Sequence, residues 1–339
     1  MKKEIDCHEF AHANARLASK SHNDSPKLAP KLAIVVPCYN EEAVVAHTYN
    51  ALCQKLNSLI AQNLIAKESF LCFVDDGSKD KTCELLLSLK TPQHKLIKLT
   101  RNYGHQNALL AGLHFVKDKC DCVISIDGDL QQDINAIDEM LVKFKNGADI
   151  VYGVRKAYTN ESASKKYSSF IFYKFMQIMG VKILYNHADY RLLSHRACAN
   201  LLEFKEVNLF LRGIVPLVGY KSEVVYYEQG ARFAGKSKYP FAKMLAFALN
   251  GITSFSIAPL RLMSVLGVVL FFASICYGIY ALYMKFFTAE PISGWTSTIL
   301  VLLFFGGMQF LGLGIMGEYI GKIYSEVKRR PRYFVEEVL

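Results

Sequence analysis

Residues 122–133 read CVISIDGDLQQD, an apolar run followed at once by a cluster of acids. The run at 122–126 is predicted to be a buried β-strand, so Asp127 and Asp129 stand at its carboxyl end, where open α/β sheets bind their ligands. Two carboxylates separated by one glycine can hold a hard divalent cation and leave room for phosphate oxygens. The alternative is a solvated Asp-Gly turn, which this tripeptide alone does not exclude.

Strands and helices alternate on both sides of this run. Further strands are predicted at 31–36, 70–74, 94–99 and 148–154. Polar residues follow each strand, which indicates an α/β fold with a doubly wound, mostly parallel sheet and one crevice at the strands' carboxyl ends. We expect residues 31–240 to form this domain, and the polar, unpatterned residues 1–30 to be a flexible tail.

The composition restricts the classes of molecule that the protein is expected to bind. The chain has 339 residues and a net charge of +10, which suits a phosphate-bearing ligand or an anionic membrane surface. No basic stripe is interleaved with aromatic residues, so we expect no nucleic-acid partner. The nine cysteines form no CxxC pair, which argues against a zinc site and favours a reducing compartment.

The last quarter of the chain is far more apolar than the rest. Residues 241–260 are predicted to be an interfacial amphipathic helix. Within 261–322, the uncharged runs 262–284 and 296–317 are each long enough to span a bilayer. Glycines in the second run permit close helix packing, which makes a homo-oligomer possible. Residues 323–339 are read as a basic tail, and the distribution of Lys and Arg predicts that the α/β domain and both termini lie in the cytoplasm.

Four motifs occur in a characteristic order: VPCYNEE at 36–42, VDDGS at 74–78, NYG at 102–104 and DGDLQ at 127–131. In order and spacing they resemble the family 2 glycosyltransferases of the A-type fold, over residues 31 to about 240. No GxGxxG follows the first strand and no GxxxxGK[ST] is present, so dinucleotide-dependent oxidoreductases and ATPases lose their main support.

The resemblance implies roles for the residues that match these motifs. Asp129, with Asp127, is expected to hold Mg²⁺ or Mn²⁺. The expected contacts to a nucleotide-sugar donor are Pro37, Tyr39, Glu41, Val74, Asp76, Asp127, Gly128 and Gln131. Two simpler interpretations stay open: Asp76 as part of a strand-end turn, and Glu41 as a carboxylate at a helix N-terminus.

A second resemblance concerns the residues that would contact the molecule to which the sugar is transferred, the acceptor. Residues 186–196 (NHADYRLLSHR) resemble the acceptor-side motif of prenyl-phosphate glycosyltransferases, in which Asp189 is a candidate base; a structural pair with Arg191 is the alternative. Asp189, Asp129 and Arg155 are the expected catalytic residues. The expected phosphate or acceptor contacts are Lys165, Lys166, Arg191, Arg232, Ser237 and Lys238.

Together these features resemble bactoprenol glucosyltransferases of the bacterial inner membrane, which act in O-antigen modification. This implies inverting transfer of glucose from UDP-glucose to polyprenyl phosphate by a multi-pass membrane protein. A dolichol-phosphate mannose synthase using GDP-mannose is the first alternative. A processive synthase would need a Gln-x-x-Arg-Trp element, and the single Trp is Trp295. A non-enzymatic scaffold with a decayed domain is disfavoured by the intact Asp76, Asp127 and Asp129.

Overall fold

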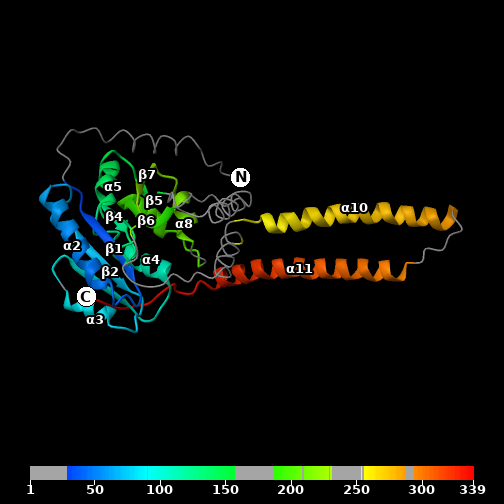
Figure 1. The fold of residues 1–339 in the computed structure, drawn as a ribbon, viewed down its shortest axis with the longest axis horizontal. Helices are drawn as coiled ribbons and strands as arrows, with labels where there is room; N and C mark the ends of the chain where they lie inside the picture. The colour runs from blue at the N-terminus through cyan, green and yellow to red at the C-terminus, as the bar shows by residue number, and fades with distance from the viewer. Residues whose placement is uncertain are drawn as a thin grey trace, which may run out of the picture.

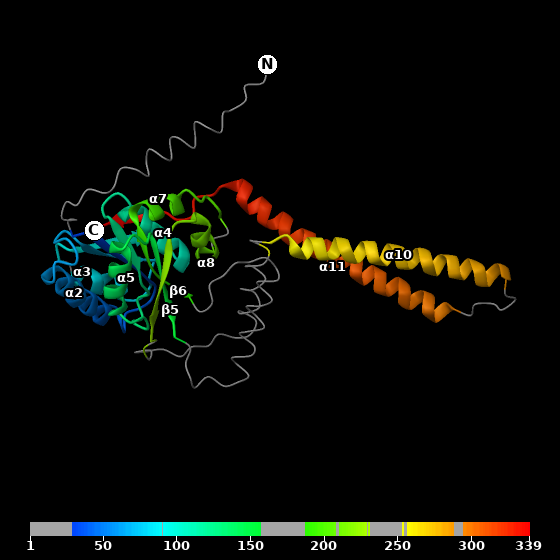
Figure 2. The same ribbon diagram turned by 90° about the horizontal axis from the view of Figure 1, so that it is seen from above.

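The computed structural model describes residues 29–89, 91–156, 187–207, 210–228, 230, 253, 256–287 and 294–339. An α/β domain carries a long hairpin of two helices, α10 (Ala258–Phe287) and α11 (Trp295–Lys328), which projects away from the domain in both views (Figures 1 and 2). Residues 1–28 of the predicted tail 1–30, most of the predicted interfacial helix and the 288–293 connection lie outside the described residues.

One eight-stranded sheet forms the centre of the domain, in the order β7-β5-β6-β4-β1-β2-β3-β8. Its strands are β1 (Leu32–Cys38), β2 (Phe70–Asp75), β3 (His94–Leu99), β4 (Cys122–Ser125), β5 (Ile150–Arg155), β6 (His187–Ser194), β7 (Ser222–Tyr227) and β8 (Val335–Val338). β1 pairs in parallel with both β2 and β4. All seven of its residues are buried, as expected of a central strand covered on both faces.

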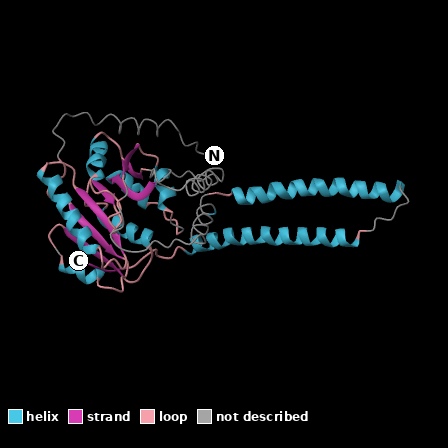
Figure 3. Ribbon diagram, in the orientation of Figure 1, coloured by secondary structure: helices cyan, strands magenta, loops and turns pink. Residues whose placement is uncertain are grey.

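Helices cover both faces of the sheet (Figure 3). One face packs on α2 (Val45–Ala61), α3 (Thr82–Ser88) and α5 (Ala136–Lys145), and the other on α4 (His105–Val116), α7 (His195–Leu202) and α8 (Leu211–Ile214). A short 3₁₀ helix, η1 (Val215–Val218), follows α8. In α2 the buried positions Val45, Tyr49, Leu52, Leu56 and Leu59 recur at helical spacing. The predicted doubly wound α/β fold is therefore confirmed.

Three strands, β6, β7 and β8, were not predicted from the sequence. The segment around Asp189 was predicted only as an acceptor-side motif, and it forms β6, which runs antiparallel between β4 and β5. Residues 323–339 were expected to be a basic tail; in the structure α11 continues to Lys328, and β8 then pairs antiparallel with β3. β8 has four residues with exposed side chains, so hydrophobic periodicity gives no signal for it.

The two long helices contain the predicted spans 262–284 and 296–317. Within the described residues, one segment, Ala258–Tyr280, is long and apolar enough to cross a membrane, and none of it is buried inside the protein. Large side chains such as Phe271, Phe272 and Phe310 are exposed along the hairpin. A continuous apolar surface of this kind needs lipid or a partner to cover it.

Candidate active site

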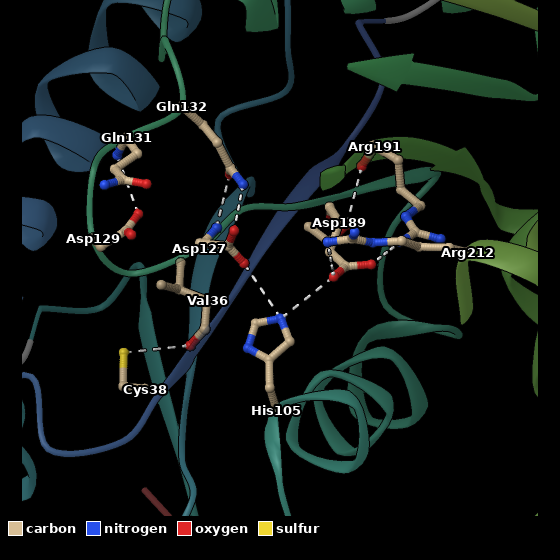
Figure 4. A network of polar contacts seen from close by, with 11 residues as sticks. Val36, Cys38, His105, Asp127, Asp129, Gln131, Gln132, Asp189, Arg191 and Arg212 are labelled. Carbon is tan, nitrogen blue, oxygen red and sulfur yellow. Dashed lines mark hydrogen bonds and ion pairs between the residues drawn. The ribbon is translucent and has the colours of Figure 1, made fainter. Parts of the chain in front are cut away.

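The acidic loop follows β4 at the carboxyl edge of the sheet, beside β1 (Figure 4). Gly128 lies so close to β1 that a Cβ there would stand 3.3 Å from Cys38 Sγ and 3.5 Å from the Pro37 carbonyl oxygen. Leu130 has a positive φ of 55°, which turns the chain back toward α5. The loop is thus held tightly by the central strand, and its two acids project from fixed positions.

Asp127 is bound on both sides by side chains. Gln132 accepts a hydrogen bond from the Asp127 backbone N–H at 2.9 Å and donates one to its carboxylate at 2.5 Å. His105 Nε2 lies 3.3 Å from the other carboxylate oxygen. Burial raises the pKa of the Asp127 carboxyl; His105 opposes the shift, while Asp189 and Asp129 add to it. A nearby cation would relieve this repulsion.

Asp129 lies two residues further along the loop and is half-buried. Its carboxylate accepts a hydrogen bond from the Gln131 backbone N–H at 3.1 Å. The carbonyl oxygen of Gln131 accepts in turn from Gly230 at 3.0 Å, which places the chain beyond β7 against the loop. Asp127, Gly128, Asp129 and Gln131 are therefore brought together as expected.

Asp189 lies on β6 between two arginines. It forms ion pairs with the buried Arg191 and with Arg212 Nη2, the latter at 3.2 Å, while His105 Nε2 is 3.9 Å away. Burial alone would raise the pKa of Asp189, but Arg191 and Arg212 outweigh it and hold this pKa well below its usual range. The pair with Arg191 that was the structural alternative is present, and Asp189 also faces the acids across His105 (Figure 4).

Asp76 follows β2 and organises the next loop. Its two carboxylate oxygens accept hydrogen bonds from the backbone N–H groups of Tyr103 at 2.7 Å and Gly104 at 2.8 Å. Burial raises the pKa of Asp76, and these two bonds oppose the shift. Because His105 comes directly after Gly104, Asp76 positions the start of α4 and thereby His105.

The other expected residues lie around this centre. Pro37 and Val74 are register partners at the ends of β1 and β2. Tyr39 is 39% exposed, and the Glu41 backbone N–H donates to Thr82 Oγ1 at 2.9 Å. Arg155 donates to the Tyr227 hydroxyl at 3.3 Å, across the ends of β5 and β7. The expected phosphate contacts Lys165, Lys166, Arg232, Ser237 and Lys238 lie outside the described residues.

Three residues of the network were not predicted: His105, Gln132 and Arg212. His105 directly follows the Asn-Tyr-Gly motif and Gln132 directly follows DGDLQ, so their neighbourhood was a usable signal. Arg212 lies on a four-residue helix, 23 positions after Asp189, and only the packing of α8 against β6 brings it there.

The residues present fit a divalent cation that is completed by a substrate. No group of three or more His, Cys, Asp or Glu side chains arranged to hold a metal occurs in the part of the chain that the structure describes. Asp127 and Asp129 supply two carboxylates, and Mg²⁺ is commonly held by one or two carboxylates together with substrate phosphates. This donor set fits a cation that is shared with a substrate phosphate rather than a closed structural metal site.

Comparison with known proteins agrees with this geometry. Residues 33–208 match Glycosyl transferase family 2, and residues 258–323 match the GtrB C-terminal hairpin. The chain is 50% identical to "Uncharacterized glycosyltransferase YkoT" of Bacillus subtilis over 91% of both chains. It is 36% identical to "SfII prophage-derived bactoprenol glucosyl transferase" of Shigella flexneri, covering 91% of this chain and 98% of that one.

Among solved structures, glucosyl-3-phosphoglycerate synthase from Mycobacterium tuberculosis aligns with a TM-score of 0.45 at 14% identity, covering 75% of this chain and 84% of that one. The assignment rests on the sequence matches, which span the α/β domain and the hairpin alike. This chain is a glycosyltransferase and belongs to glycosyl transferase family 2.

Proposed function

We propose that this enzyme transfers glucose from UDP-glucose to polyprenyl phosphate at the bacterial inner membrane. The observation that carries the proposal is the placement of two opposite charge clusters on either side of His105 at one edge of the sheet. Asp127 and Asp129 form the acidic side, while Arg191 and Arg212 surround Asp189 on the other, and His105 lies between Asp127 and Asp189. The acids suit a cation-bound donor diphosphate, and the partly exposed Arg212 suits the phosphate of the acceptor.

In the reaction, a phosphate oxygen of the acceptor forms a bond to the anomeric carbon, and the bond from that carbon to the donor diphosphate breaks. The electron pair of the broken bond leaves with UDP, and attack from the opposite face inverts the configuration. A Mg²⁺ or Mn²⁺ ion held by Asp127 and Asp129 would neutralise the departing diphosphate as a Lewis acid. Arg212, with a side chain 34% exposed, can bind the acceptor phosphate on the other side of His105, beside Asp189.

No general base is needed for this acceptor. A phosphate monoester has a second pKa of about 6 and is largely ionised at neutral pH. Asp189 is poorly suited to remove a proton, because its two arginine partners keep its pKa low. We assign it the role of holding Arg191 and Arg212 in place beside His105.

The hairpin supports the membrane part of the proposal. Its exposed apolar side chains would be covered by the bilayer, and the polyprenyl chain of the acceptor would lie in the same lipid. Both helices are then proposed to span the membrane, with the catalytic domain and both termini in the cytoplasm because Lys and Arg are richer on those flanks.

A substrate panel tests the proposal. Membranes that contain the enzyme are incubated with polyprenyl phosphate, Mn²⁺ or Mg²⁺ and radiolabelled UDP-glucose, UDP-galactose or GDP-mannose. We expect lipid-extractable label chiefly from UDP-glucose, and none with Asp129→Ala. Label from GDP-mannose alone would identify a mannose synthase instead. No labelled lipid from any donor would refute a polyprenyl-phosphate acceptor.

A further inference from the structure

The chain beyond α11 returns to the α/β domain and is bound there at several points (Figure 1). In the last turns of the helix, the Glu326 carboxylate accepts the backbone N–H of Val207, with both oxygens at 2.9 Å. Arg332 donates to the Phe204 carbonyl oxygen at 2.6 Å. β8 then pairs with β3, and the Leu339 and Leu96 backbones exchange two hydrogen bonds of 2.8 Å. The end of the hairpin is thus joined to the edge of the catalytic sheet.

This segment contacts the loop that follows β3 and the helix that follows the loop. The Phe334 carbonyl oxygen accepts the Thr100 N–H at 3.1 Å, and the Phe334 ring packs edge-on against Tyr103 with centroids 6.5 Å apart. The Tyr103 hydroxyl lies 2.8 Å from Thr100 Oγ1. One residue earlier, the Tyr333 hydroxyl lies 2.8 Å from His114 Nδ1 on α4. Residues 333–334 therefore hold the loop and α4 from the same side.

The same loop leads into the active site. The N–H groups of Tyr103 and Gly104 are held by Asp76, and Gly104 has a φ of 91°, so the chain turns sharply there into α4. His105 comes next and contacts Asp127 at 3.3 Å. A series of direct contacts consequently runs from the end of α11 through Phe334 and Tyr103 to the acid that is expected at the donor diphosphate.

We propose that the C-terminal segment 332–339 is a positioning element for the donor site, acting through Tyr103 on His105 and Asp127. Covering the edge of β3 would need only the backbone pairing of β8. Two contacts lie outside that pairing: the Phe334 ring on Tyr103 in the loop before α4, and the Tyr333 hydroxyl on His114 of α4 itself. The inference depends on the chain being a glycosyltransferase, and not on which sugar or acceptor it uses.

The test compares Phe334→Ala with Val338→Ala. Phe334→Ala removes the ring that packs on Tyr103 but keeps the backbone bond to Thr100. Val338→Ala trims an exposed side chain of the same strand, at the end opposite to the loop. We expect Phe334→Ala to raise the KM for the nucleotide sugar about tenfold, as small misplacements at a distance do. The KM for the lipid acceptor, and both KM values in Val338→Ala, should stay at wild-type levels, and Phe334→Tyr should restore the donor KM.

A double-mutant cycle tests whether Phe334 affects the donor site through Tyr103. If Phe334 acts through Tyr103, the Tyr103→Ala/Phe334→Ala double variant should be no worse for donor KM than Tyr103→Ala alone. Three results would overturn the proposal: additive effects of the two substitutions on the donor KM, an unchanged donor KM in Phe334→Ala, or an equal increase of the donor KM in Val338→Ala. If Phe334→Ala does not fold, Phe334→Leu is tested in its place. A folded Phe334→Leu variant with the wild-type KM for the donor would also overturn the proposal.

A binding measurement separates this inference from the proposed function. Titration calorimetry with Mn²⁺ and UDP or GDP reports the donor site without any acceptor. A wild-type protein that binds a nucleotide but labels no polyprenyl phosphate contradicts the proposed acceptor only. Weaker nucleotide binding by Phe334→Ala, about tenfold, still supports the positioning role, whereas equal binding contradicts it.

Discussion

The hydroxyl of Thr48 on α2 donates a 2.7 Å hydrogen bond to the carbonyl oxygen of Gly128, the residue between the two acids. Thr48 is fully buried, and no charged group takes part in this contact. The arrangement of the acidic loop therefore depends on the packing of α2 against the sheet as well as on the loop's own sequence.

Replacing Thr48 by Val should loosen this loop. Val leaves the Gly128 carbonyl oxygen buried without its donor, which costs about 1–3 kcal/mol in the free energy of unfolding. We expect a matching decrease in urea stability and weaker Mn²⁺-dependent nucleotide binding by calorimetry. Thr48→Ser keeps the hydroxyl and serves as the control. A Val variant with wild-type stability and affinity would show that the bond has no influence on the loop.

Asp129→Ala should abolish formation of lipid-linked sugar, with a loss of at least about a hundredfold, because a carboxylate that would hold the cation at the leaving group is removed. Circular dichroism and membrane fractionation should show a folded, membrane-associated protein. The matched control is Asp118→Ala, whose side chain is 74% exposed and pairs with His195 rather than with the active-site residues. Substantial residual activity in Asp129→Ala would remove its proposed role at the metal.

Asp189 should contribute to stability in a pH-dependent way. Its pKa in the folded protein is lowered by Arg191 and Arg212, while the unfolded value is about 3.9. Its ionised form therefore stabilises the fold fully above that value, and the contribution is lost as the pH falls toward the lower folded pKa. Asp189→Asn leaves Arg191 buried beside a neutral group, so we expect a loss of about 3–5 kcal/mol at pH 7.

Urea unfolding at pH 7 and pH 3 checks this prediction, because the difference between wild type and Asp189→Asn should be smaller at the lower pH. The pH–rate profile is a second measurement. If Asp189 is a positioning residue, the wild-type rate should show no acid limb from it between pH 5 and 8. An Asn variant that is equally stable at pH 7 would contradict the role of the ion pair.

Two glycines with positive φ allow a matched comparison. Gly77 follows Asp76 with a φ of 65°, and a Cβ there would stand 2.5 Å from the Arg101 carbonyl carbon. Gly147 has a φ of 89° and nothing within 4 Å of a built Cβ. Gly147→Ala should lose about 1 kcal/mol from backbone strain alone. Gly77→Ala should lower the free energy of unfolding by more than this, and it should also lower activity because Arg101 leads into the loop that carries His105. Equal decreases in the melting temperature of the two variants would contradict this prediction.

Local sequence patterns were sufficient to predict much of the α/β domain. The strands β1, β2, β4 and β5 are mainly apolar runs followed by polar residues, and Asp127, Asp129, Asp76 and Pro37 stand at their carboxyl ends as predicted. Such runs are recognisable because a parallel strand covered on both faces buries nearly every residue. β6, β7 and β8 were missed because their position depends on partners far along the chain: Ser125 faces Arg191, Ile150 faces Ser222 and Ile97 faces Val338.

The sequence by itself determined that a doubly wound sheet presents two acids at the end of its fourth strand. The apolar residues of this strand and the acids that follow it are consecutive in the chain, so a local pattern is enough to predict them. Only the tertiary structure decided that His105 stands between Asp127 and Asp189, that Arg212 shares Asp189 with Arg191, and that the C-terminus completes the sheet. These contacts join residues far apart in the chain, up to Leu96 and Leu339 at the edge of the sheet, and no local periodicity encodes such a pairing.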